Sequence, residues 1–419
     1  MFPYQPLEAS YRRSFILGVL NGLFFNTAAA LLSGSTVIPL FVSRLTDSKI
    51  LIGLSGTLET MGWFMPQLLA AALTLHHASQ LKIYHKAAYL RIASFFFLVL
   101  TVFLLPLKNP LLCLILFFLL YSVFSIGAGM AGVSFIDIVG RSIPPQRRGS
   151  FFAMRMILGG ALGILAGLAV NRFLVLLDYP NNFGMIFLFA FIFIVGGLIS
   201  FMVVNEPKLL TPRVKRTAMQ NIKIAYAFFK SNRNYLSLFW VRTAVSSFLL
   251  GYPFYIIFAK QVLGYPAGSA GIFLAFEMGG FLLSNFLWGY LSDRINNRLV
   301  LLLSAVCATL TPLLAIASFW ATLPVYIFAL SFFLLGAAES GLFVGFINYI
   351  LEIAPDEHRP LYLGFLHSLV SLTFFLPALG GVILEISSYR FLFGLLFILG
   401  IVSTYLAYRL YRLPDRAAN

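Results

Sequence analysis

Long apolar runs alternate with short polar stretches along the whole chain. About 20 apolar residues in a helix cross the hydrocarbon core of a bilayer, whereas strands of a membrane barrel alternate apolar and polar residues. The runs lack that alternation, so the pattern predicts an all-α membrane protein with twelve transmembrane helices. The spans are expected at about residues 14–43, 48–75, 87–106, 110–138, 150–174, 183–204, 235–260, 268–290, 298–318, 323–350, 361–384 and 389–411.

The longest polar stretch, residues 205–234, contains Pro207, Pro212 and many basic residues. It divides the chain into an N-terminal six-helix bundle (1–204), a cytoplasmic connector (205–234) and a C-terminal six-helix bundle (235–419). Two interpretations of the connector stay open: a helix along the membrane surface at about 217–230, or a plain solvated linker.

Composition supports the membrane assignment, because 60% of the residues are hydrophobic and only 10% are charged. Soluble globular proteins do not have such a composition. The net charge of +15 is unevenly distributed. With the N-terminus inside, the Lys and Arg residues on the outer side are only Arg44, Lys49, Lys108, Arg172, Lys260 and Arg390. This positive-inside bias places both termini in the cytoplasm, in a plasma or bacterial inner membrane. A nucleic-acid partner is therefore unnecessary to explain the charge.

No catalytic or cofactor-binding pattern is present in the sequence. It lacks the Gly-x-x-x-x-Gly-Lys-Ser/Thr loop that binds nucleotides. Cys113 and Cys307 lie in apolar segments, and His76 and His77 have no further ligands at metal-binding spacing. We therefore expect no cofactor, no metal and no enzymatic activity.

The two halves of the chain resemble each other. Four residues of the second span recur at one constant separation in the eighth: Gly53, Glu59, Gly62 and Gln67 correspond to Gly271, Glu277, Gly280 and Asn285. Pro144 and Pro355 each stand four residues before an arginine at the start of the fifth and eleventh spans. Such repetition predicts two pseudo-symmetric bundles.

A short polar hairpin between the eighth and ninth spans carries residues at fixed offsets. It resembles the loop signature of the major facilitator superfamily, Gly-x-Leu-(small)-Asp-Arg-x-x-x-Arg before an apolar helix. The residues that fit are Gly289, Leu291, Ser292, Asp293, Arg294, Arg298 and Leu301. Asn296 and Asn297 replace the commoner Gly and Arg.

The resemblance covers essentially the whole chain and implies two bundles that rock around a central site at the bilayer midplane. It implies that spans 1, 4, 7 and 10 line the cavity. It also implies a conformational latch, in which Asp293 lies near the start of the fifth span and Gly289 permits a close approach. Arg294 or Arg298 then holds the carboxylate. The stripe of Gly159, Gly163 and Gly167 in the fifth span is expected to pack between the bundles.

Ionisable residues inside a span are costly and are candidates for function. Glu339, near the middle of the tenth span, is the leading candidate for proton or substrate binding, with a buried polar contact as the alternative. Glu59 and Glu277 form a symmetric pair, which indicates either proton coupling or structural hydrogen bonds.

Other polar residues of the spans give further candidates. Arg242 could pair with a carboxylate or extend to the inner surface. Asn26 and Asn348 could bind a substrate or join helices. Arg155 is expected to form an ion pair with Asp137.

The sequence thus predicts a monomeric secondary transporter whose partners are a small-molecule substrate, protons and membrane lipid. The many aromatic residues near these polar groups favour an amphipathic organic solute. Pro377-Ala378-Leu379-Gly380-Gly381 resembles the end of the antiporter motif and favours proton-coupled efflux. The alternatives are proton-coupled or facilitated uptake, and a non-transporting sensor or lipid-handling protein of the same fold.

Overall fold

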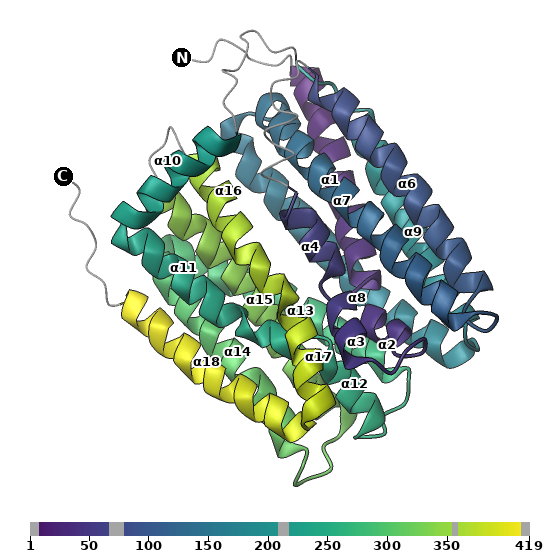
Figure 1. The fold of residues 1–419 in the computed structure, drawn as a ribbon. Coiled ribbons are helices and arrows are strands. Elements are labelled where there is room, and N and C mark those ends of the chain that lie inside the picture. Colours follow the sequence, from purple (N-terminus) through teal and green to yellow (C-terminus); the bar gives the residue numbers. More distant parts are fainter. Residues whose placement is uncertain (1–7, 67–78, 208–217, 354–358, 412–419) are drawn as a thin grey trace. The chain divides into compact units, whose positions relative to one another are not determined.

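A computed structural model describes residues 8–66, 79–207, 218–353 and 359–411, and every regular element in these ranges is a helix (Figure 1). Within them, 11 helical segments are long and apolar enough to cross a membrane. The all-α membrane class is therefore confirmed. The expected second span differs from the others: its described part consists of two short helices, and Gln67 lies outside the described residues, as do His76 and His77.

The chain forms two compact units, each described separately below. Unit 1 comprises Met1–Asp47 and Ser55–Ala218, and unit 2 comprises Ser48–Leu54 and Met219–Asn419. Ser48–Leu54 therefore belongs to unit 2, although the sequence places it within the N-terminal bundle. Its contacts explain this grouping, because the Glu385 carboxylate accepts hydrogen bonds from Ser48 Oγ (3.2 Å) and from the backbone nitrogen of Lys49 (3.1 Å).

Unit 1 contains α1 (Glu8–Leu31), α2 (Val37–Val42), α4 (Leu58–Phe64), α6 (Gln80–Leu104), α7 (Pro110–Ser142), α8 (Pro145–Leu176) and α9 (Asn181–Met202). Helix α1 packs on α8 and α9, α6 packs on α7 and α9, and α4 packs on α7. Local sequence sets the helix starts: at α7, Asn109 Oδ1 accepts a hydrogen bond from the backbone nitrogen of Leu112 (3.0 Å), and Pro110 occupies the first turn.

Unit 2 contains α3 (Lys49–Ser55), α10 (Ala218–Ser231), α11 (Arg233–Val245), η1 (Ser246–Leu250), α12 (Phe254–Gln261), α13 (Ser269–Arg294), α14 (Asn297–Ala317), α15 (Val325–Ile353), α16 (Arg359–Val370), η3 (Ser371–Phe375), α17 (Leu376–Ile386) and α18 (Tyr389–Tyr411). Helix α13 packs on α15, α14 packs on α15 and α18, and α11 packs on α18. These pairs repeat those of unit 1: second span with fourth, third with fourth and sixth, first with sixth.

Two equivalent glycines carry this repeat into the helix crossings. A Cβ added to Gly62 would lie 2.2 Å from Ser125 Cβ, where α4 crosses α7. A Cβ added to Gly280 would lie 2.0 Å from the carbonyl oxygen of Phe333, where α13 crosses α15. Both crossings therefore require a residue without a side chain, which is the physical reason for the repeat at these positions.

The seventh and eleventh spans are broken, whereas the fifth span is the single helix α8 (Figure 1). The breaks are the 3₁₀ segments η1 and η3, whose hydrogen bonds have poorer geometry than those of an α-helix. Helix α17 packs tightly on η1, since a Cβ on Gly380 would lie 1.9 Å from the carbonyl oxygen of Leu250. A Cβ on Gly381 would lie 2.3 Å from the carbonyl oxygen of Lys49.

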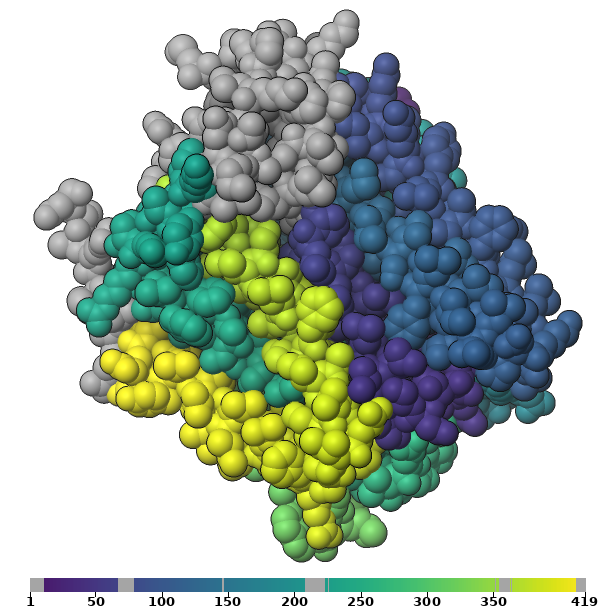
Figure 2. All heavy atoms as spheres, viewed as in Figure 1, coloured from purple at the N-terminus to yellow at the C-terminus, as the bar shows by residue number. Residues whose placement is uncertain are grey.

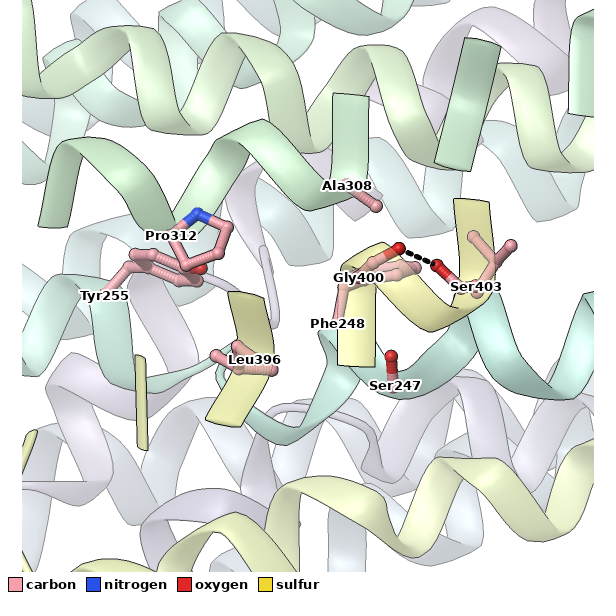
Figure 3. A pocket seen from close by; sticks show the side chains of 9 residues that line it. Ser247, Phe248, Tyr255, Ala308, Pro312, Leu396, Gly400 and Ser403 are labelled. Atoms are coloured by element: carbon pink, nitrogen blue, oxygen red, sulfur yellow. Dashed lines mark hydrogen bonds between the residues drawn. The ribbon is translucent and has the colours of Figure 1, made fainter. Parts of the chain in front are cut away.

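A small pocket in unit 2 lies beside this break, between the seventh, ninth and twelfth spans (Figure 3). Pro312 has no N–H, so the carbonyl of Ala308 loses its helical donor. Ser403 Oγ donates to the carbonyl of Gly400 (2.8 Å) on the opposite wall. The pocket has no room for a water-sized molecule, so it is a packing gap at the kink and not a solute site.

The outer helices expose large apolar side chains, as expected for helices in contact with lipid. Helix α18 lies open on the face shown in Figure 2, and its exposed apolar residues include Phe391, Ile398, Ile401, Val402 and Tyr405. The connector helix α10 is amphipathic: Phe228 stacks on Tyr362 (4.1 Å between ring centroids), whereas Tyr226 and Lys230 are exposed. The expected helix at 217–230 is thus present as α10. Residues 208–217 of the connector lie outside the described residues.

Candidate functional sites in the two helical units

Unit 2 holds a charged cluster at the middle of the tenth span. Glu339 lies halfway along α15 with an exposed side chain, and its carboxylate is close enough to Arg242 of α11 to interact electrostatically. Arg242 Nη1 donates to Ser246 Oγ (2.8 Å), and the guanidinium carbon lies 5.4 Å from the ring centroid of Phe346. Arg242 is therefore held inside the unit and does not extend to the surface.

His367 is a further member of this cluster and was not among the residues predicted from the sequence. Its ring stacks on Phe346, with 5.5 Å between ring centroids and 13° between planes. Its charge would also act on Arg242, so helices α11, α15 and α16 each contribute an ionisable group. The sequence could have indicated His367, because it is an ionisable residue inside the apolar eleventh span, and ionisable residues are rare in transmembrane helices.

Glu277 occupies a different environment. It is 1% exposed and accepts a hydrogen bond from the Tyr252 hydroxyl (3.2 Å). A Cβ on Gly336 would lie 2.0 Å from the carbonyl oxygen of Glu277, which places this residue at the tightest part of the crossing between α13 and α15. This position favours the structural alternative for Glu277.

Unit 1 also buries an acid and an arginine. Glu59 of α4 accepts a hydrogen bond from the Tyr121 hydroxyl of α7 (3.1 Å). Arg91, in the middle of α6, is 3% exposed and interacts electrostatically with Glu59. In the positive-inside pattern Arg91 falls on the inner side, because it lies near the expected edge of the third span. The structure places it within the helical bundle.

Asn26 joins two helices of unit 1. Its Nδ2 donates to the carbonyl of Arg155 (3.1 Å), and a Cβ on Gly159 would lie 2.5 Å from Asn26 Cβ. The contact of Gly159 is therefore with α1 of the same unit. Gly163 and Gly167 are also buried on α8, and their packing between bundles stays a prediction.

The expected ion pair between Asp137 and Arg155 is replaced by other contacts. Arg155 donates to the carbonyl of Gly18 and to Asn21 Oδ1 (3.0 Å). Asp137 pairs with Arg141, which also donates to Glu206 (2.7 Å). The physical reason is that α8 packs along α1, which supplies the acceptors for Arg155, while on α7 the guanidinium carbon lies 4.5 Å from the ring centroid of Phe135 instead of beside Asp137.

The loop motif forms a polar network at the end of unit 2. Asn348 Nδ2 donates to Ser292 Oγ (3.0 Å), which in turn donates to Asn297 Oδ1 (2.6 Å). Asn348 thus serves this network. Arg298 is 8% exposed and lies 5.4 Å from the ring centroid of Tyr349.

The remaining motif residues are accessible. Asp293 and Arg294 are exposed, and a Cβ on Gly289 would meet no atom of the described structure within 4 Å. Their role as a latch stays a prediction. The described residues contain no group of three or more His, Cys, Asp or Glu side chains that could hold a metal ion.

The fold is that of a polytopic helical membrane protein. The family model of the Major Facilitator Superfamily matches residues 252–419. This match to the C-terminal part of the chain confirms the resemblance drawn from the loop motif. A search of curated proteins found no match.

Three solved structures illustrate the similarity of fold. The nucleoside transporter NupG is 14% identical, with a TM-score of 0.71 over 96% of this chain and 100% of that chain. A D-xylose-proton symporter is 16% identical, with a TM-score of 0.70 over 97% and 99%. A POT family transporter in complex with a thioalcohol-conjugated peptide is 12% identical, with a TM-score of 0.70 over 96% and 97%.

Proposed function

We propose that this protein is a secondary active transporter that moves a small organic, amphipathic solute by alternating access, coupled to protons, in the direction of efflux. The observation that carries the proposal is the exposed Glu339 carboxylate at mid-span beside the anchored Arg242. An ionisable group at that depth is costly and persists where it serves transport. The match of residues 252–419 to a transporter family also supports a non-enzymatic role.

Protonation of Glu339 would change the net charge of the cluster. With the carboxylate ionised, its charge balances that of Arg242; with the carboxylate neutral, the guanidinium is uncompensated. A change of this size in a low-dielectric site alters which solute and which conformation the cluster favours. The flat faces of Phe346 and His367 beside the charges support an amphipathic solute.

The test is transport by the purified protein in proteoliposomes, with a labelled solute chosen by its stabilisation of the native protein against heat. Glu339→Gln should abolish transport driven by a pH gradient while preserving counterflow exchange. Asp47→Asn, which changes an exposed acid outside the spans, is the matched control and should preserve both. Full pH-driven transport by Glu339→Gln would contradict the proposal and transfer the role to Glu59 or Glu277.

Uptake is the second candidate direction, and the structural similarity to a D-xylose-proton symporter favours it. The glycines of the antiporter-like segment do not decide between the directions, because packing on Leu250 and Lys49 accounts for Gly380 and Gly381. Solute accumulation measured in vesicles with an acidic interior and in vesicles with an acidic exterior distinguishes efflux from uptake. Solute that accumulates inside vesicles while protons leave them indicates proton-solute exchange and supports efflux. Solute that enters the vesicles together with protons supports uptake.

A further inference from the structure

Arg91 is the most deeply buried charged group among the described residues whose hydrogen bonds are incomplete. Its side chain is 3% exposed, yet Nε and Nη2 have no hydrogen-bond partner. A buried guanidinium with free donors is unfavourable unless another group completes its hydrogen bonds.

The surroundings of Arg91 are shaped for this side chain. The guanidinium carbon lies 4.5 Å from the ring centroid of Phe124 and 5.7 Å from that of Phe25. A Cβ on Gly127 would lie 2.9 Å from Arg91 Cγ, so α7 leaves space for the arginine at that point. Aromatic faces from α1 and α7 therefore enclose a free cationic fork.

The carboxylate of Glu59, near Arg91, can gain or lose a proton and so change the net charge of the cluster. Glu59 interacts with it electrostatically, but no direct ion pair joins the two groups in the described part of the chain. The other titratable group facing Glu59 is Tyr121, which donates a hydrogen bond to it; Tyr84 lies beside Arg91, and Arg155 acts on Tyr84. Glu59 is partly exposed, so the cluster reaches the surface of unit 1 at this carboxylate.

We propose that Arg91 is the binding site for the anionic group of an amphipathic organic anion, and that protonation of Glu59 admits this anion. A guanidinium fork binds a carboxylate or sulfonate through two parallel hydrogen bonds, and the flanking rings pack on the organic part. With Glu59 ionised, the site is neutral overall and an anion is repelled by the carboxylate. With Glu59 protonated, the site carries one positive charge.

Proton and anion therefore bind cooperatively, and each strengthens the binding of the other by the same factor. This inference rests on the proposed transport function and names its class of solute. Because proton and anion bind together, it favours uptake, the second candidate direction, over efflux. Binding itself is measured without transport, so the two proposals fail separately. If Glu339→Gln keeps pH-driven transport while the anion still binds at Arg91, the proposed function is wrong and the site stands.

The experiment measures the thermal stability of the purified full-length protein with benzenesulfonate, whose charge is constant between acidic and neutral pH. Benzenesulfonamide, which is neutral in that range, is the matched ligand control. We expect benzenesulfonate to stabilise the protein more at acidic than at neutral pH, and benzenesulfonamide to have no such effect. Arg91→Met should weaken binding at least about tenfold. Lys86→Met, which removes an exposed charge from the same helix, should leave it unchanged.

Glu59→Gln is the decisive second variant, because it removes the charge beside Arg91 and leaves Arg91 itself unchanged. It should bind benzenesulfonate tightly at both pH values. Arg91→Lys retains the charge without the fork and should bind with intermediate affinity. Equal binding of the sulfonate and the sulfonamide, unchanged binding by Arg91→Met, or an unchanged pH dependence in Glu59→Gln would each overturn the proposal.

Discussion

Each unit places one arginine near one carboxylate, but the two units hold the guanidinium differently. In unit 2, Ser246 Oγ accepts from Arg242 Nη1 and donates to the Arg242 carbonyl, both at 2.8 Å. In unit 1, Arg91 Nε and Nη2 have no hydrogen-bond partner, and its guanidinium lies against the Phe124 ring. The difference indicates that similar charges can serve two tasks: an anchored arginine responds to its neighbour's protonation, whereas an unanchored one is available to a ligand.

The backbone differs in parallel with the charges. Ser246 is the first residue of η1, the break in the seventh span, so the anchor of Arg242 is also the point where the helix changes geometry. Arg91 lies in the uninterrupted helix α6. A change in charge at Glu339 therefore acts through Arg242 on a deformable segment, whereas Arg91 is held by a continuous helix. Discontinuous helices beside binding sites are typical of transporters.

The largest expected effect tests the feature that the units share. Gly280→Ala and Gly62→Ala should each destabilise the protein by about 2 kcal/mol, because the added Cβ overlaps the facing helix. Gly279→Ala is the matched control, since a Cβ there meets nothing within 4 Å in the described structure. Thermal unfolding in detergent gives the measurement. Equal melting temperatures for Gly279→Ala and Gly280→Ala would show that the crossings are not tightly constrained.

The second prediction concerns a difference between the two halves of the sequence. The loop after the second span has Lys82 and Lys86 but no acid corresponding to Asp293. Asp293→Asn should shift the ratio of inward-open to outward-open protein about tenfold, through the loss of about 1.4 kcal/mol from the latch. Spin labels at the loop ends of the two bundles report this ratio as a distance distribution. Asp178→Asn, in a different loop, is the control, and an unchanged distribution in Asp293→Asn would contradict the latch.

The smallest expected effect comes from a substitution that would leave Arg242 of unit 2 without its hydrogen-bond anchor, as Arg91 of unit 1 is. Ser246→Ala removes the hydroxyl that holds Arg242 and should slow pH-driven transport about threefold, as the loss of one modest hydrogen bond implies. Ser247→Ala, one residue further along η1, should leave the rate unchanged. A rate for Ser246→Ala equal to that of the unmodified protein would mean that the anchor has no part in coupling.

Hydropathy was sufficient to predict the eleven spans that the described residues contain as long apolar segments, and spacing predicted the internal repeat, because both depend on burial along the chain. They could not locate Arg91, since the hydrophobic boundary of the third span falls near it whether the side chain points outward or inward. The partner of Arg155 depends on how α8 is rotated against its neighbours, and the sequence carries no direct measure of that rotation. The break at η1 was not predicted, because Ser246–Leu250 contains no Pro or Gly and continues the apolar run of the seventh span.

The close crossings at Gly280, Gly336 and Gly380 all face backbone oxygens, those of Phe333, Glu277 and Leu250. A compensating change in a neighbouring side chain cannot relieve a clash with a backbone atom. These positions are therefore closed to gradual size changes during evolution, whatever the solute. A directed-evolution library intended to change the cargo should keep the three glycines fixed and vary the ring-bearing positions Phe124 and Phe346 instead.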